Sequence, residues 1–191
     1  MSNGSFSLNK FYRESKKTLF RPKAYFTAME TTGGWGEPVL KALLYGVIAG
    51  IFILIWSLLD VIGVTTGVFS GNVGVVGFFG TIIGAVIGVF IVGLIILILS
   101  SLCKGNKNYQ ANSRVAAAIM IIVPVNAVLG FFSGISYGLG VIISMIINLY
   151  GVYMLYAALT LTLKGNQKSA KAVAYILGAL VVVITIIGLF L

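Results

Sequence analysis

Few residues in this chain could carry acid–base or metal chemistry. It has no histidine, one cysteine (Cys103) and four carboxylates, of which Glu14, Glu30 and Glu37 precede the first apolar run. The fourth, Asp60, closes that run. The usual zinc and iron ligand sets need histidine or several cysteines, and general acid–base catalysis needs a base positioned beside its substrate. We therefore predict a non-enzymatic protein with no bound metal and no cofactor.

The polar residues that remain inside the apolar runs are uncharged. Asn126 follows Pro124 by two positions, and Ser144 and Asn148 share a later run. A proline frees a backbone carbonyl within a helix, and polar groups at membrane depth are functional candidates by default. Hydrogen bonding between helices is the interpretation that we prefer for Asn126 and Asn148. The alternative is a polar break at mid-membrane, used by a small transporter or channel subunit.

The composition predicts an integral membrane protein. Of the 191 residues, 59% are hydrophobic and 9% are charged, whereas a soluble domain carries roughly 25% charged residues. A helix needs about 20 apolar residues to cross a bilayer, and five runs meet this need: 39–59, 73–102, 115–132, 139–163 and 172–191. Because these runs do not alternate polar and apolar residues as barrel strands do, we predict an all-α fold with five transmembrane helices. Residues 1–38 form a polar, basic segment before a transmembrane domain at 39–191.

The positions of the cations predict the orientation. The chain has 13 Lys and Arg and a formal net charge of +9. Beyond the N-terminal segment and Lys41, they occupy two short loops, at 104–114 and 164–171. Five spans with a cytoplasmic N-terminus and an external C-terminus place every basic cluster on the cytoplasmic side, as the positive-inside rule requires. The lipid bilayer is then the first partner, and its anionic headgroups explain the charge better than nucleic acid, which we exclude.

Residues 8–21 predict an amphipathic helix. At 100° per residue one face carries Leu8, Phe11, Tyr12 and Leu19, with basic residues opposite. Such a helix suits the cytoplasmic headgroup layer, and the alternative is a tail helix packed on the inner loops. Pro22 ends this pattern and begins a second short helix.

Two sequence repeats concern packing and helix ends. Gly80, Gly84 and Gly88 recur at four-residue spacing, which predicts a close helix contact within the chain or, as a second choice, in a homo-oligomer. Lys104-Gly105-Asn106 is repeated as Lys164-Gly165-Asn166. We expect each glycine to be the left-handed residue that stops a helix.

Several motifs resemble the Yip family of integral membrane proteins, over about residues 19–190. Leu19-Phe20-Arg21-Pro22, followed by Phe26, resembles the lead-in to its first span. Residues 105–124, with Arg114 and Pro124, resemble the loop into its third helix, and residues 147–153, with Tyr150, resemble its fourth helix.

The resemblance implies a non-enzymatic five-span protein. Eukaryotic relatives bind prenylated Rab-type GTPases and act in membrane traffic at the Golgi and endoplasmic reticulum. This chain lacks their long cytosolic N-terminal region and their Asp-Leu-Tyr-Gly-Pro type motif, which argues against a Rab-type partner. Its short form resembles the bacterial and archaeal branch, so we expect a cell membrane location in a prokaryote, and the endoplasmic reticulum or Golgi in a eukaryote.

We therefore predict a membrane-organising, trafficking-related or scaffold protein that acts through lateral lipid or protein contacts. Other membrane proteins or a second copy of this chain would be its protein partners. A polar cavity that reaches Asn126 and Asn148 would favour the transporter alternative, and dry packing throughout would favour the scaffold.

Overall fold

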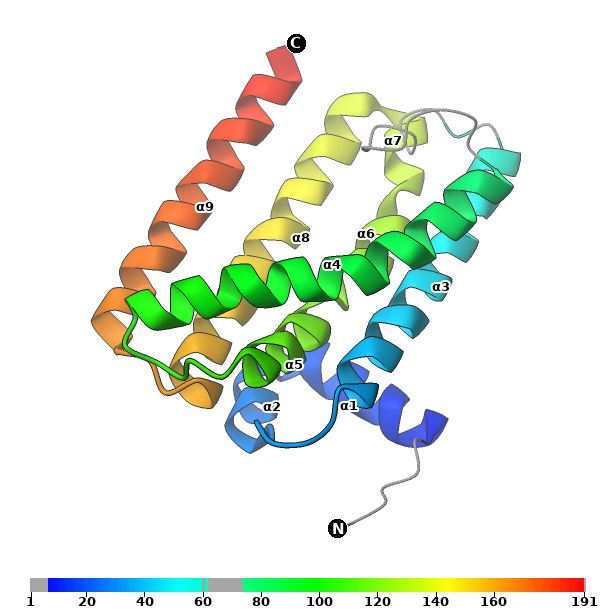
Figure 1. Cartoon of the computed structure of the whole chain (residues 1–191). Helices are drawn as coiled ribbons and strands as arrows, with labels where there is room; N and C mark the ends of the chain where they lie inside the picture. The colour runs from blue at the N-terminus through cyan, green and yellow to red at the C-terminus, as the bar shows by residue number, and fades with distance from the viewer. Residues whose placement is uncertain (1–6, 60, 62–73, 191) are drawn as a thin grey trace.

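The computed structural model describes residues 7–59, 61 and 74–190, so that Asp60 and residues 62–73 lie outside the described part. The described residues form helices and no strand (Figure 1). Five helical segments are long and apolar enough to cross a membrane: α3 (Gly36–Leu58), α4 (Val75–Leu102), the segment Tyr109–Ile135, the segment Tyr137–Thr162 and α9 (Gln167–Phe190). The all-α, five-span prediction is confirmed.

Two of the spans are interrupted. The third consists of α5 (Tyr109–Ile119), α6 (Ile122–Leu129) and α7 (Phe131–Ile135), and the break after α5 lies four residues before Pro124. A proline ring clashes with the carbonyl four residues earlier, here that of Met120, which instead accepts a hydrogen bond from the Val123 amide at 2.9 Å. The fourth span consists of α8 (Tyr137–Ala157) and a π-helical turn, η1 (Ala158–Thr162).

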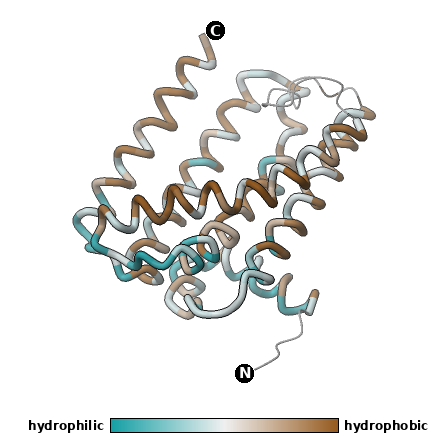
Figure 2. Tube along the Cα trace, viewed as in Figure 1, coloured by the Kyte–Doolittle hydropathy of each residue, from teal (hydrophilic) through white to brown (hydrophobic). Residues whose placement is uncertain are grey.

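Two short helices precede the first span. They are α1 (Leu8–Phe20) and α2 (Pro22–Ala28), which has Pro22 in its first turn, so both elements occur where the sequence predicts them. Both lie at the end of the bundle that also holds the loops 103–108 and 163–166, and α9 finishes at the opposite end (Figures 1 and 2). We call the end that holds α1, α2 and these two loops the basic end.

The core surrounds α5. Every residue from Ala111 to Ile121 is buried, and a helix that is covered on all sides must be enclosed by its neighbours. Helix α4 packs along both α3 and α5, whereas α9 packs mainly on α8. Close approach of α3 to α4 depends on Gly46 and Gly50, because a Cβ on Gly46 would lie 2.8 Å from the Ala85 Cβ and 3.1 Å from the Ile82 Cα.

The glycines at 80, 84 and 88 lie on another part of α4. All three are half-buried. A Cβ on Gly80 would meet no atom within 4 Å, and one on Gly88 would make an ordinary contact of 3.9 Å with Met120. Within the described residues the tight α3–α4 contact therefore uses the small residues of α3. The stripe at Gly80 is open to lipid or to a partner.

Candidate functional site

Four charged side chains form an ion-pair cluster where α1, α3 and α5 meet. The Lys41 Nζ lies 2.8 Å from Glu14 Oε2 and 2.7 Å from Glu37 Oε1. Arg114 pairs with the other oxygen of Glu37. Lys41 and Arg114 are only 4% and 7% exposed, and a buried cation requires such partners. The cluster is formally neutral and joins the N-terminal helix to the first and third spans.

Lys41 and Arg114 are buried and paired, whereas cations in loops beside a membrane are expected to reach the headgroup layer. A lysine near a helix end could extend its ammonium group to the surface, but Lys41 is buried and paired. Arg114 belongs to the predicted basic loop, yet its side chain points into the protein, where its Nε also donates to the Glu30 carbonyl at 3.2 Å. The spacing of Glu37 and Lys41, four residues apart on one helix, is the sequence signal that indicates their pairing.

Phe26 and Tyr150, which carry part of the family resemblance, and Tyr25 beside Phe26 link the N-terminal helices to the spans. The Tyr25 hydroxyl accepts a hydrogen bond from Lys41 at 3.2 Å. Phe26 is fully buried, and its carbonyl accepts from the Thr162 hydroxyl at 2.6 Å. Tyr150 donates to the carbonyl of Leu19. These contacts attach α1 and α2 to the first and fourth spans, and Arg114 links the third span to Glu30, two residues after α2.

The predicted apolar face of α1 divides into two parts. Phe11 and Leu19 are half-buried against the bundle, and the Phe11 ring lies 5.1 Å from that of Tyr45. Leu8 and Tyr12 are each 68% exposed. The helix therefore packs on the bundle along one side and presents apolar groups outward along another.

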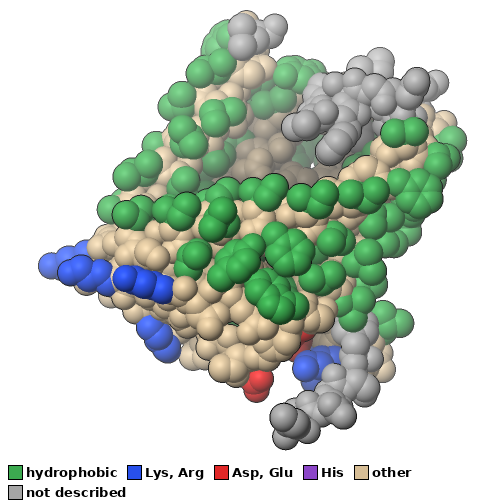
Figure 3. All heavy atoms as spheres, viewed as in Figure 1, with side chains coloured by type: hydrophobic (Ala, Val, Ile, Leu, Met, Phe, Trp, Pro, Cys, Tyr) green, Lys and Arg blue, Asp and Glu red, His purple; other side chains and the backbone are tan. Residues whose placement is uncertain are grey.

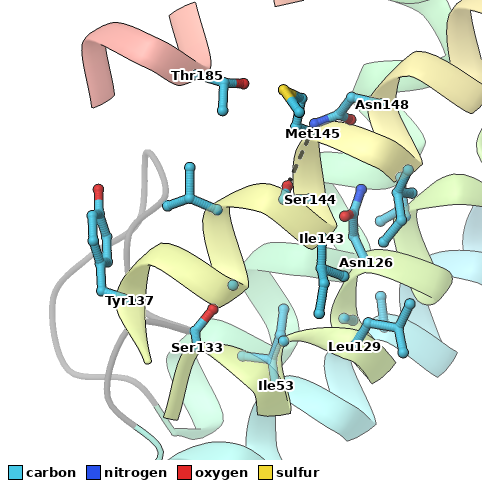
Figure 4. A pocket seen from close by; sticks show the side chains of 17 residues that line it. Ile53, Asn126, Leu129, Ser133, Tyr137, Ile143, Ser144, Met145, Asn148 and Thr185 are labelled. Atoms are coloured by element: carbon cyan, nitrogen blue, oxygen red, sulfur yellow. Dashed lines mark hydrogen bonds between the residues drawn. The ribbon is translucent and has the colours of Figure 1, made fainter. Parts of the chain in front are cut away.

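A crevice of about 380 Å³ opens between α3, α6, α7, α8 and α9 (Figure 4). Its polar lining residues come from three spans and are all uncharged: Asn126, Ser133, Tyr137, Ser144, Asn148 and Thr185. Asn126 and Asn148, predicted as polar intramembrane residues, project toward the same space (Figure 4). Asn148 lies about 16 Å along α8 from Tyr137 at 1.5 Å per residue, which is roughly the middle of a 30 Å hydrocarbon core.

The Asn126 side chain has no hydrogen-bond partner among the described residues. Asn148 donates to the Ser144 hydroxyl at 3.4 Å, and Tyr137 and Thr185 donate to backbone carbonyls of α9. The Asn126 side chain is half-buried and makes no hydrogen bond to the described residues. An unsatisfied amide at membrane depth costs free energy, so the crevice can stabilise a molecule that offers Asn126 a hydrogen bond.

The crevice ends toward the basic end. The interior there is filled by residues with little or no exposed surface, including Val115, Met154, Ala158 and Leu163. The crevice is therefore closed toward the basic end in this structure.

Cys103 has no exposed surface. It follows the last residue of α4, and burial raises the pKa of its thiol. A neutral, covered thiol is a packing residue.

Comparisons with known proteins agree with these features. Neither the curated proteins nor the solved structures give a match. The family model described as the Yip1 domain matches residues 16–190, which is nearly the whole chain. That range contains the cluster residues Glu37, Lys41 and Arg114, the crevice and all five spans. The chain therefore belongs to the Yip1-domain family of membrane proteins.

Proposed function

We propose that this protein is a non-enzymatic membrane-organising or scaffold protein that acts through lateral contacts. The crevice holds a membrane-embedded ligand or a polar group of a neighbouring protein, and the basic end contacts anionic headgroups of the cytoplasmic leaflet. The observation that carries the proposal is the filled core around Met154 and Leu163, which closes the crevice toward the basic end, so that the described residues form a pocket for a bound group and not a path across the membrane. Since the described residues that line the cavity carry no charge, an ion would lose its hydration beside them without compensation, and we infer a neutral ligand.

Helix α1 supports the contact with headgroups. Its outward apolar residues, Leu8, Tyr12 and Phe20, are 68–71% exposed. Lys16 and Lys17 are also exposed. Apolar and basic side chains that are exposed together on one helix are the pattern of a helix that lies in the headgroup layer.

Photocrosslinking tests the crevice. A diazirine-bearing amino acid at Met145, which lines the crevice, should capture a narrow set of membrane molecules. At Ile87, which is 54% exposed on α4, it should capture bulk lipid. Asn126→Leu removes about 1.4 kcal/mol of hydrogen bonding, so it should lower the Met145 yield about tenfold without changing the Ile87 yield. Identical products and yields at the two positions would exclude a binding site in the crevice.

Transport is the second candidate, and the crevice itself favours it. A polar cavity that reaches Asn126 and Asn148 is the feature that distinguishes a transporter from a dry scaffold, and the proline break beside Asn126 resembles the discontinuous helices of transporters. Transport would require a second arrangement in which the core around Met154 opens.

Uptake of a neutral solute tests this candidate. Urea and glycerol match the uncharged lining, and their entry into liposomes that contain the purified chain should equal entry into empty liposomes if the scaffold proposal is correct. Faster entry that Asn126→Leu abolishes would replace the scaffold by a transporter.

A further inference from the structure

The two loops that share the Lys-Gly-Asn sequence have the same conformation. Lys104 and Lys164 have φ values of 56° and 54°, so lysine and not glycine is the left-handed residue that ends each helix. The next turn is also shared: Asn106 Oδ1 accepts from the Asn108 amide at 2.8 Å, and Asn166 Oδ1 accepts from the Lys168 amide at 2.9 Å. A lysine rarely adopts this φ, so its occurrence twice at equivalent positions makes the loops structural repeats.

The two loops also pair with each other. The Asn106 amide donates to the Leu163 carbonyl at 2.7 Å, and the Asn166 amide donates to the Cys103 carbonyl at 2.6 Å. Each bond is the counterpart of the other, so an approximate twofold axis passes between the loops. The glycines permit this approach, since a Cβ on Gly105 would lie 2.8 Å from the Leu163 oxygen.

Pairing gathers five lysines on one part of the basic end. They are all exposed: Lys104, Lys107, Lys164, Lys168 and Lys171. None of them belongs to an ion pair among the described residues, where Glu14 and Glu37 are held by Lys41 and Arg114. Lysine side chains cluster in Figure 3 beside the end of α4 and the start of α9. The patch therefore has a strong positive field that the protein does not neutralise.

Two helix N-termini reinforce this field. Helix α5 begins at Tyr109 and α9 at Gln167, each directly after one of the loops. Asn108 Oδ1 accepts from the Ala111 amide and Asn166 Oδ1 from the Lys168 amide, so each helix adds the partial positive charge of its N-terminus and not a set of free amides. Each half of the paired loops thus combines a left-handed lysine, a second lysine and a helix start.

We propose that the paired loops form a single site for a lipid headgroup that carries two phosphate groups, one facing each loop. The inference rests on the proposed contact of the basic end with anionic headgroups and adds a defined place and a preferred ligand. Two equivalent cationic halves match two phosphates of one headgroup better than an isolated phosphate. A lipid is the source because the loops end two membrane spans, and Leu102, directly before the first loop, is 67% exposed, so that an acyl chain has an apolar side chain to contact beside the lysines.

Lipid retention in native mass spectrometry tests the site. The full chain is released from bilayers that contain cardiolipin, with two phosphates per headgroup, or phosphatidylglycerol at equal total phosphate. We expect cardiolipin to be retained about tenfold more, and the preference to disappear in the double variant Lys104→Asn/Lys164→Asn. Asparagine tolerates the left-handed conformation, so the loops should keep their pairing, and an unchanged melting temperature verifies this.

The matched control removes the same charge elsewhere. Arg13→Gln/Lys23→Gln changes two exposed cations of α1 and α2 and should leave the cardiolipin preference intact. Equal loss in the two double variants, or no preference in the unaltered chain, would overturn the paired-loop site while leaving the general headgroup contact in place. Failure to retain either anionic lipid would overturn the headgroup contact as well.

Discussion

Replacement of Glu37 by glutamine should destabilise the protein by about 3 kcal/mol, the lower part of the range for breaking a buried ion pair. Glu37 is the carboxylate shared by Lys41 and Arg114. Without its charge, Arg114 keeps only the Glu30 carbonyl as a partner among the described residues, and an almost completely buried cation loses its counterion. The lower value is expected because the Glu37 side chain is 34% exposed. Reversible unfolding in mixed micelles measures the change.

Lys10→Gln is the control for this prediction. Lys10 lies 3.8 Å from Glu14, and its side chain is 58% exposed, so the loss should be below about 0.5 kcal/mol, as for most surface ion pairs. An equal effect of the two substitutions would show that the buried ion pairs of Glu37 contribute no more than an ordinary surface ion pair.

Replacement of Gly46 by valine should cost about 3 kcal/mol of stability, the upper part of the range for overpacking a core. The Cβ alone would lie 2.8 Å from the Ala85 Cβ, and the atoms next nearest to it are backbone atoms of α4, at Ile82 and Thr81. Backbone cannot rotate aside as a flexible side chain can, so α3 and α4 must separate. The separation can be measured by thiol labelling at position 81, with Thr81→Cys in a Cys103→Ser background. Adding Gly46→Val to this background should increase the labelling.

Gly80→Val is the matched control on α4. A Cβ there meets nothing within 4 Å, so the stability in detergent should change by less than about 0.5 kcal/mol, as at most exposed sites. A change in oligomeric state with this variant would indicate that the Gly80, Gly84 and Gly88 stripe contacts a second copy. A loss as large as that of Gly46→Val would contradict the assignment of the tight contact to α3.

The sequence predicts the spans well because exclusion of charge from lipid acts on each segment separately. An uncharged run of about 20 residues can therefore be assigned to a helix from its own sequence. Pro22 and Pro124 likewise predict a helix start and a helix break, because the proline ring restricts the backbone in the same way in any protein. The burial of Lys41 and Arg114 at the ends of the first and third spans could not be predicted in this way. These cations lie within or beside spans because Glu14 and Glu37 neutralise them, and this pairing depends on tertiary structure.

The candidate site was only partly predictable for the same reason. Asn126 and Asn148 stand out as polar residues in apolar runs, but their facing one crevice depends on how α6 and α8 pack. The repeat of Lys-Gly-Asn is visible in the sequence. The left-handed conformation of each lysine could not be predicted, because a glycine follows each lysine and is the ordinary left-handed residue. The pairing of the two loops could not be predicted either, because it depends on tertiary structure.

The attachments of the N-terminal helices set an order for biosynthesis. Leu19 is held by Tyr150 and Phe26 by Thr162, at separations of 131 and 136 residues. A ribosome has therefore produced most of the polypeptide before either hydrogen bond can form, and closing so long a loop is slow. Until then α1 can pack only on the first span, through Glu14 with Lys41 and Phe11 with Tyr45, and its other apolar residues remain in contact with lipid. The N-terminal helices thus reach the membrane face early and complete their attachment to the fourth span last.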